Sequence, residues 1–173
     1  MDEDGAHRVE RAKAGDGRAF EELLAPVLEP GFRLAMTMLN DRTAAEDAVQ
    51  EAALKAWRKL DRFQPEAQLR PWFLAIVANE CRSARRTRWW HVLRFADVRT
   101  QRTVPDLAQR LDLDAALDRL SRHHLLPLVL YYHLDLPIDE VARVLRCSEG
   151  AARQRVHRAL AALRPAMGLE VNA

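Results

Sequence analysis

The stretch PIDEVARVLRCSEGAARQRVHRALAALR, residues 137–164, decides the fold of the C-terminal part of this chain. Its apolar residues recur every three or four positions in two runs, which is the spacing of amphipathic helices. Two residues separate the runs, and Ser148 is a favourable N-cap for the second. We therefore predict a helix-turn-helix with helices over 138–145 and 148–163.

The side of the second helix that faces away from its apolar residues is rich in arginine. In a helix-turn-helix, this helix enters the major groove of DNA and presents its N-terminal side chains to base edges. Arginine can pair with guanine and glutamine with adenine, whereas other arginines hold phosphates. An amphipathic hairpin with a solvated basic face is the alternative. The candidate DNA-binding residues are Ser148, Arg153, Gln154, Arg155, His157 and Arg158.

Helical spacing of apolar residues also extends over most of the chain that precedes this stretch. Ala, Leu and Arg dominate, only 6 Gly and 2 Tyr are present, and long alternating Val/Ile/Thr runs are absent, which favours helices over sheet. Pro30 and Gly31 should break or kink the first helical pattern, and Thr43 with Glu46 has the spacing of a capping box. Further helices are predicted over about 20–28, 32–39, 43–60, 71–84, 112–120 and 122–134. The alanines of the helix over 43–60 form its apolar stripe together with Trp57.

The domain organisation follows from where this periodicity is lost. Residues 89–111 lack a regular apolar pattern and contain a proline, so we read them as a linker. We therefore predict an all-α protein with two small helical domains joined by that linker. The domains cover 19–88 and 112–166, with a polar N-terminal tail over 1–18 that is frayed at its tip and a C-terminal tail over 167–173.

Charge is separated into blocks along the chain, although the net charge is only +2. Residues 1–30 carry a net charge of −4, residues 70–102 of +6 and residues 143–164 of +5. Such separation suggests surfaces for more than one kind of partner, although solvated helix faces would also produce it.

Several classes of protein are disfavoured. The six histidines show no HExxH or triad-like context and no glycine-rich phosphate loop is present, so we expect no catalytic residue, metal site or cofactor. Cys81 and Cys147 have no metal-ligand spacing, and we expect both to be small buried residues. The acidic N-terminus is not a secretory signal, and the longest apolar stretch, 125–134, is too short to span a membrane. A cytoplasmic protein is therefore expected.

Three segments together resemble a known family. Residues 137–164 look like region 4 of sigma-70 factors, TAAEDAVQEAALKAWRKLDRF (43–63) resembles region 2.2, and QLRPWFLAIVANECRSARR (68–86) is similar to regions 2.3–2.4. With only these regions and a short linker, the chain resembles the extracytoplasmic-function (ECF) subfamily. The resemblance implies a sigma factor that directs promoter recognition, strand opening and transcription initiation. Its implied partners are core RNA polymerase (β′ clamp and β flap), promoter DNA and an anti-sigma factor, with no insertion into a membrane.

The resemblance also implies roles for particular residues in the first domain. Asp47, Gln50, Glu51 and Leu54 match the face that docks on the β′ clamp, and a merely solvated helix face is the alternative. Trp72 is either core or part of a wall beside melted DNA. The residues that match minus-10 recognition and melting are Gln64, Glu66, Gln68, Trp72, Asn79, Arg82, Arg85, Arg86 and Arg88.

In the second domain, the predicted DNA-binding residues of the helix-turn-helix match the face that reads the minus-35 element. Arg146 stands where the family usually has glycine, so the turn is expected to differ. Leu125, Leu126 and Pro127 replace a usually polar stretch; the leucines are either core or a contact site, and Pro127 should kink or restart its helix. The alternative function is a helix-turn-helix regulator that acts without polymerase, as a dimer.

Overall fold

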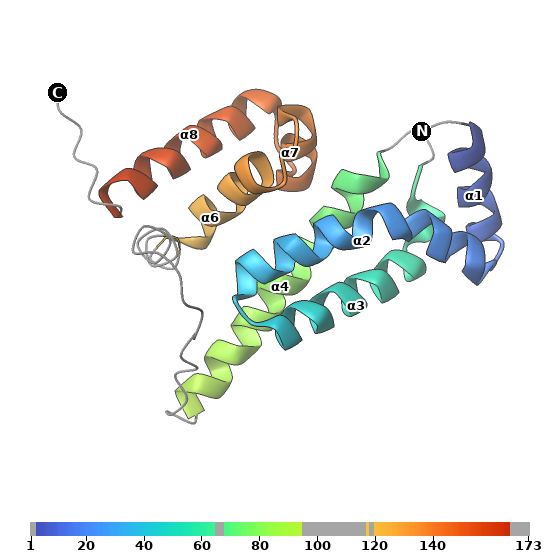
Figure 1. The fold of residues 1–173 in the computed structure, drawn as a ribbon, viewed down its shortest axis with the longest axis horizontal. Coiled ribbons are helices and arrows are strands. Elements are labelled where there is room, and N and C mark those ends of the chain that lie inside the picture. The colour runs from blue at the N-terminus through green and yellow to red at the C-terminus, as the bar shows by residue number, and fades with distance from the viewer. Residues whose placement is uncertain (1–2, 65–67, 95–116, 118–119, 167–173) are drawn as a thin grey trace. The chain divides into compact units, whose positions relative to one another are not determined.

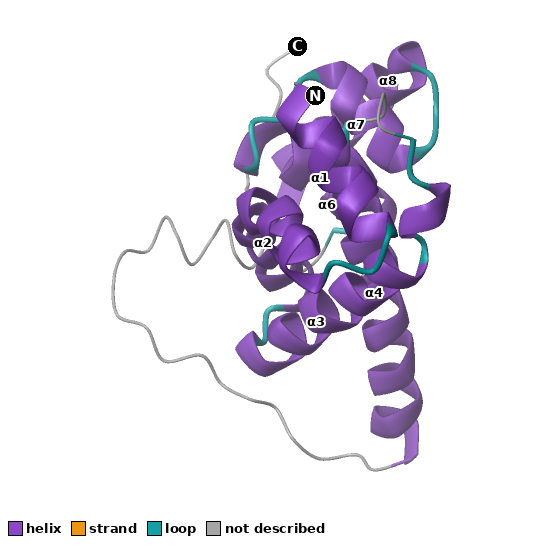
Figure 2. Cartoon of the chain, turned by 90° about the vertical axis from the view of Figure 1, so that its right-hand side faces the viewer, coloured by secondary structure: helices purple, strands orange, loops and turns teal. Residues whose placement is uncertain are grey.

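A computed structural model describes residues 3–64, 68–94, 117 and 120–166, without the side chains of 3–4, 85–94, 122 and 164–166. Every regular element in these ranges is helical and none is a strand, as Figure 2 shows, so the predicted all-α class is confirmed. The described chain forms two compact units, and each is considered by itself below. None of its helices is both long and apolar enough to cross a membrane.

Two antiparallel helices form the centre of the first unit, α2 (Gly17–Leu39) and α3 (Arg42–Arg58), which lie side by side in Figure 1. Asn40 ends α2 in a left-handed conformation, φ 55°. Asp41 then caps α3, because its carboxylate accepts a hydrogen bond of 3.0 Å from the backbone N–H of Ala44. A two-residue connection therefore suffices to reverse the chain.

The helix α2 runs without interruption through Pro26 and Pro30. The predicted separate helices over 20–28 and 32–39 are thus wrong. Each proline removes one backbone hydrogen bond from the helix. Apolar residues on both sides of Pro30, from Leu23 to Met38, are buried, and this tertiary burial holds the helix together where local propensity alone would end it.

The buried face of α3 consists of alanines, whose small side chains let this helix approach its neighbours closely. The helix begins at Arg42, and its N-cap is Asp41 rather than the predicted Thr43, because Asp41 offers the same carboxylate-to-amide bond two residues earlier. The short 3-10 turn η1 (Leu60–Arg62) follows α3. The buried alanines are Ala45, Ala48, Ala52 and Ala56.

The long helix α4 (Leu69–Arg94) packs against both α2 and α3. Gly31 of α2 is buried, and a Cβ atom there would lie only 2.9 Å from Cε1 of Phe73 in α4. Lys55 of α3 and Glu80 of α4 form an ion pair of 2.5 Å, with the Glu80 side chain only 12% exposed. These contacts connect α4 to the α2–α3 pair.

Residues 3–13 form a further helix, α1 (Glu3–Lys13), so the prediction of a polar tail over 1–18 is wrong for these residues. The fraying expected at the tip falls on residues 1–2, which lie outside the described residues. Val9 and Ala12 are buried in a cluster with residues of α2, with Leu60 of η1 and with Phe63. Burial of these few apolar side chains holds α1 against the rest of the first unit, although the sequence of α1 is mostly polar.

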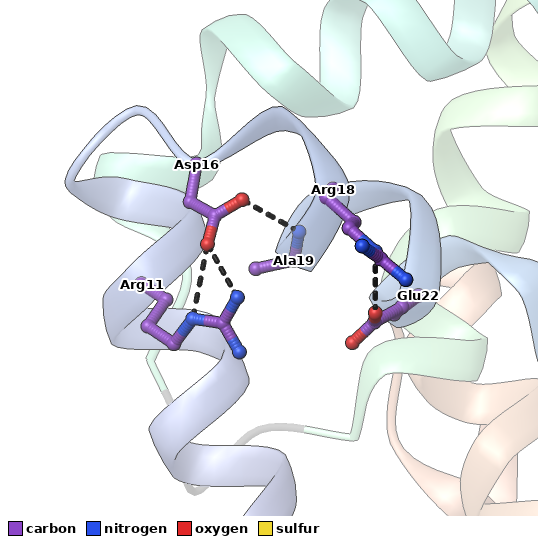
Figure 3. A network of polar contacts seen from close by, with 5 residues as sticks. All are labelled: Arg11, Asp16, Arg18, Ala19 and Glu22. Atoms are coloured by element: carbon purple, nitrogen blue, oxygen red, sulfur yellow. Dashed lines mark hydrogen bonds and ion pairs between the residues drawn. The ribbon is translucent and has the colours of Figure 1, made fainter.

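Asp16 fixes the corner between α1 and α2 (Figure 3). Its carboxylate accepts a hydrogen bond of 3.1 Å from the N–H of Ala19 and pairs with the guanidinium of Arg11 at 2.5 Å. The bond from Ala19 and then the bond from Arg11 lower the pKa of Asp16 below its usual value. Beside it, Arg18 and Glu22 form an ion pair of 3.5 Å along α2.

The C-terminal part of the chain, which supplies most of the second unit, contains α6 (Arg122–Leu128), a π-helical turn η2 (Val129–His133), α7 (Ile138–Leu145) and α8 (Glu149–Ala166). The helix α6 packs against α8. The predicted helices over 138–145 and 148–163 are confirmed, with α8 continuing three residues further.

Leu125 and Leu126 are core residues of this unit, with 5% and 4% of their surface exposed, which resolves the two alternatives that the sequence left open. Pro127 is fully buried within α6 and does not end it; the chain widens into η2 two residues later. This widening leaves Tyr131 and Tyr132 exposed, with their rings edge to face at 5.0 Å.

The two cysteines differ in burial. Cys81 in α4 is completely buried, as predicted, whereas Cys147 in the turn before α8 is only half-buried, so that prediction is wrong for Cys147. Neither forms a disulfide.

Candidate binding surfaces

The exposed face of α3 carries the four residues predicted to bind polymerase. Alanines occupy the opposite face, so the polar and longer side chains of α3 project outward. Asp47 and Glu51 form no ion pair with any residue that the structure describes, and their negative charge is therefore open to a partner. All four side chains are exposed, namely those of Asp47, Gln50, Glu51 and Leu54.

An apolar surface continues this face beyond Leu54. Leu54 is 50% exposed and Trp57, less than one turn further along α3, is 38% exposed. The ring of Phe20 from α2 contacts the ring of Trp57 edge to face, with centroids 4.9 Å apart. The sequence placed Trp57 on the buried stripe of this helix, which is wrong, because its ring contacts Phe20 of α2 and still stays 38% exposed.

The segment between η1 and α4 holds the residues predicted to receive a minus-10 base. Gln64 and Gln68 are described and both are exposed. Glu66 lies outside the described residues. The structure therefore places the two ends of this candidate site on the surface of the first unit.

Trp72 lies at the start of α4, beside this segment. Its ring packs against Phe63 with centroids 4.8 Å apart and an angle of 50° between the ring planes. Phe63 is 2% exposed and belongs to the buried cluster of α1, α2 and η1, whereas Trp72 is half-buried. Trp72 therefore packs on the core, in agreement with the first alternative, and still reaches the surface; a place beside melted DNA stays a prediction.

Further along α4, Asn79 and Arg82 are exposed on one face. The guanidinium of Arg82 donates a hydrogen bond of 2.6 Å to Oδ1 of Asn79. The backbone of residues 85–88 continues α4, but the side chains of Arg85, Arg86 and Arg88 lie outside the described part of the structure.

The helix α8 presents the residues predicted to read the minus-35 element. Ser148 caps it, because its hydroxyl accepts a hydrogen bond of 3.3 Å from the N–H of Ala151. Two pairs along the helix arrange the outer side chains: Arg153 with Glu149 at 3.6 Å, and Arg158 with Gln154 at 3.1 Å. The buried face again consists of small residues. The exposed side chains are Ser148, Arg153, Gln154, Arg155, His157 and Arg158.

The turn between α7 and α8 keeps the geometry that glycine usually provides, although it contains Arg146. The N–H of Arg146 donates to the carbonyl of Arg143 at 3.2 Å, and that of Cys147 donates to the carbonyl of Ala142 at 3.0 Å. These two bonds make a Schellman motif, in which the first residue after the helix is left-handed. Arg146 has φ 52°, at a cost of roughly 1–2 kcal/mol for a residue other than glycine. The expectation of a different turn is wrong.

Comparison with known proteins assigns both units to one family. The model for sigma-70 region 2 matches residues 20–91, and the model for sigma-70 region 4 matches residues 116–165. The chain belongs to the sigma-70 family. The face of α3 lies within region 2 of this sigma factor, and the helix-turn-helix lies within region 4.

Relatives of similar length place the sigma factor in the ECF subfamily. It is 30% identical to the RNA polymerase sigma factor CarQ of Myxococcus xanthus over 92% of this chain and 95% of CarQ. It is also 30% identical to the ECF RNA polymerase sigma factor SigL of Mycobacterium tuberculosis, over 91% and 93% of the two chains. The sigma factor RpoE, solved with the anti-sigma factor NepR from Bartonella quintana, matches with a TM-score of 0.69, 27% identity and coverage of 89% and 98%.

Family membership favours a sigma factor over the alternative of a regulator that acts without polymerase. Sequence reasoning missed one feature beside the candidate residues, the exposed ring of Trp57 next to Leu54. The position of Trp57, three residues after Leu54, was a usable signal for it. For the left-handed conformation of Arg146, the signal was its place at a position where the family usually has glycine.

Proposed function

We propose that this sigma factor binds core RNA polymerase through the exposed face of α3 and holds promoter DNA through α4 and α8. One observation carries the proposal. The face of α3 formed by Asp47, Gln50, Glu51 and Leu54 exposes two carboxylates, whereas the exposed face of α8 carries three arginines, Arg153, Arg155 and Arg158. The surface of α3 suits a basic protein partner, and the surface of α8 suits the phosphates and base edges of DNA.

The proposed polymerase site combines charge with an apolar end. Asp47, Gln50 and Glu51 would face basic groups of the β′ clamp, and Leu54 would bury apolar surface beside them. The β flap is the proposed partner of region 4. Because Asp47 and Glu51 are not neutralised within the described chain, docking would not first require an internal ion pair to break.

The proposed DNA sites lie in both units. On the minus-10 side, unpaired bases would be held near Trp72, and the arginines of α4 would meet the backbone. On the minus-35 side, Arg153 and Gln154 would meet base edges in the major groove while other arginines hold phosphates. The minus-10 set is Gln64, Glu66, Gln68, Trp72, Asn79, Arg82, Arg85, Arg86 and Arg88, and the minus-35 set is Ser148, Arg153, Gln154, Arg155, His157 and Arg158.

The sigma factor would act through binding alone, without catalytic chemistry of its own. Duplex opening costs about 1.4 kcal/mol per base-pair step, and contacts to the trapped single strand would offset that cost. Because its polymerase partner works on genomic DNA, we place the protein in the cytoplasm. The RpoE–NepR complex supports an anti-sigma factor as a further partner, which would cover the same surfaces.

Transcription with purified components tests the proposal. The chain is added to core RNA polymerase on fragmented genomic DNA, and the 5′ ends of the RNA are mapped. We expect discrete start sites that appear only when the chain is present, together with co-elution of chain and core enzyme in gel filtration. A chain that neither co-elutes with core enzyme nor creates any start site would contradict the proposal.

A further inference from the structure

Three residues other than glycine have positive φ in the described part of the chain, and Arg146 differs from the other two. Asn40 has φ 55° and Asp135 has φ 49°. Asn and Asp tolerate this region because their short polar side chains can bond to the nearby backbone. Arginine gains nothing comparable, so its presence at φ 52° is unfavourable for folding.

The structure gives Arg146 no internal role that would compensate for this strain. Its side chain is exposed. Within the described residues, its guanidinium has no hydrogen-bond or ion-pair partner. The two backbone bonds of the Schellman motif involve only main-chain atoms, which glycine would supply equally well. No described residue of the chain therefore accounts for a cationic side chain at this position.

The position of Arg146 indicates which kind of ligand its side chain would bind. It lies two residues before Ser148, which caps α8, so its side chain starts at the end of α8 that enters the groove in a helix-turn-helix. The wall of that groove is lined with phosphates. The surrounding segment, residues 143–164, carries a net charge of +5, so an anion is favoured there.

We propose that Arg146 binds a DNA phosphate beside the groove that α8 enters. The inference rests on the proposed role of region 4 in binding DNA. Arg146 would hold the backbone and set the register of α8 without reading sequence, because phosphate contacts carry no base information. It adds a binding residue to the minus-35 surface described above.

A salt titration with the full chain tests this. The probe is a short fluorescein-labelled DNA duplex of random sequence, since a phosphate contact does not depend on sequence, and binding is followed by anisotropy between about 50 and 200 mM salt. For Arg146→Gly we expect a higher Tm, about a five- to tenfold weaker affinity near 100 mM salt, and a log–log salt slope smaller by about 1. Stability and affinity would thus change in opposite directions.

Two variants separate charge from backbone strain. Arg146→Lys keeps the cation and the positive φ, and we expect it to retain the wild-type slope. Asp135→Gly also relieves a positive φ, eleven residues before Arg146 in the sequence, and we expect a higher Tm with no loss of affinity. Wild-type affinity and slope in Arg146→Gly would overturn the proposal.

Arg158→Ala in the same titration separates the role of Arg146 from that of α8, because Arg158 is one of the α8 arginines proposed to hold phosphates. If Arg158→Ala weakens binding and Arg146→Gly does not, the role of Arg146 fails while the DNA-binding role of α8 stands. If neither variant weakens binding to the duplex, phosphate binding by both residues is contradicted, while the proposed polymerase site is tested separately by transcription with core enzyme.

Discussion

The helices α3 and α8 show how two surfaces of similar construction come to serve different partners. Each buries a face of small residues, Ala45 to Ala56 in α3 and Ala152 to Ala159 in α8, and each exposes its long polar side chains. The exposed face of α3 carries Asp47 and Glu51, whereas that of α8 is dominated by arginine. The packing of the helices therefore says little about the partner, and the sign of the exposed charge says most.

The two units also cap their helices differently. In the first unit, the carboxylates of Asp16 and Asp41 accept the capping hydrogen bonds. In the second, the hydroxyl of Ser148 does so at the start of α8. A carboxylate cap depends on pH and a hydroxyl cap does not, so the units should respond differently to acid.

The largest effect is expected when the charge of α3 is reversed. Asp47→Lys with Glu51→Lys would place cations against a basic partner surface, and like charges in an interface cost several kcal/mol. We expect affinity for core polymerase to fall by more than about 100-fold, with transcription lost and the helical circular dichroism unchanged. Gel filtration and fluorescence anisotropy with labelled core enzyme measure the binding.

A matched control changes the net charge equally at another place. Glu21→Lys with Glu29→Lys alters two exposed acids of α2. We expect this variant to bind core enzyme with an affinity close to that of the wild type. If both double variants bind core enzyme like the wild type, the proposal that the acidic face of α3 binds polymerase is contradicted.

The next largest effect is expected on α8. Arg153→Ala should weaken selection of the minus-35 element by about 1–3 kcal/mol if the guanidinium reads a base edge. Competition between a mapped promoter and single-base variants of it measures this selection. An equal loss on every sequence would reassign Arg153 to phosphate binding, and α8 would then resemble α3 in recognising charge alone.

A smaller effect is expected from close packing in the first unit. Gly31→Ala places a methyl group 2.9 Å from the ring of Phe73, so we expect the free energy of unfolding to fall by about 1–2 kcal/mol. Gly17→Ala is the control, because no atom lies within 4 Å of a Cβ there, and it should be neutral or slightly stabilising. Urea unfolding measures both. Equal stability of the two variants would show that α2 and α4 can separate without cost.

The smallest effect is a difference in pH dependence between the caps. Because the folded protein lowers the pKa of Asp16, this carboxylate stabilises the fold above its unfolded pKa, about 3.9, and the stabilisation is lost as the pH falls through the lower folded pKa. Asp16→Ala should therefore be destabilising near neutral pH and nearly neutral in strong acid. Ser148→Ala should cost about 0.5–2 kcal/mol with little dependence on pH. Thermal unfolding over this pH range compares them, and a parallel response of both variants would contradict the distinction.

Much of the second unit could be predicted because its signals are local. The apolar spacing of α7 and α8, the two-residue separation and the serine cap gave the bounds of both helices within a few residues. The first unit depended more on contacts between distant residues. The continuity of α2 through Pro30 follows from burial on both of its sides, and the packing of α1 follows from a cluster completed by Phe63. No window of local sequence contains those contacts.

The candidate binding surfaces also include features that local sequence predicts and features that depend on contacts between helices. Exposure of Asp47, Glu51 and the arginines of α8 follows from helical periodicity, and the structure agrees with it. The exposure of Trp57 was missed because an aromatic residue beside alanines was taken as part of the apolar stripe. Whether a large ring fits between α2 and α3 depends on the distance between the helices, which alanines had already made short.

The exposed tyrosine pair of η2 has a practical consequence. Tyr131 and Tyr132 are the only tyrosines of the chain, and all four tryptophans precede residue 95. Indole fluorescence therefore reports on the first half of the chain, where the ring of Trp72 packs against Phe63. Second-derivative absorbance of the phenol rings reports on the second half. The melting of each half can thus be followed by its own natural chromophore, without a label.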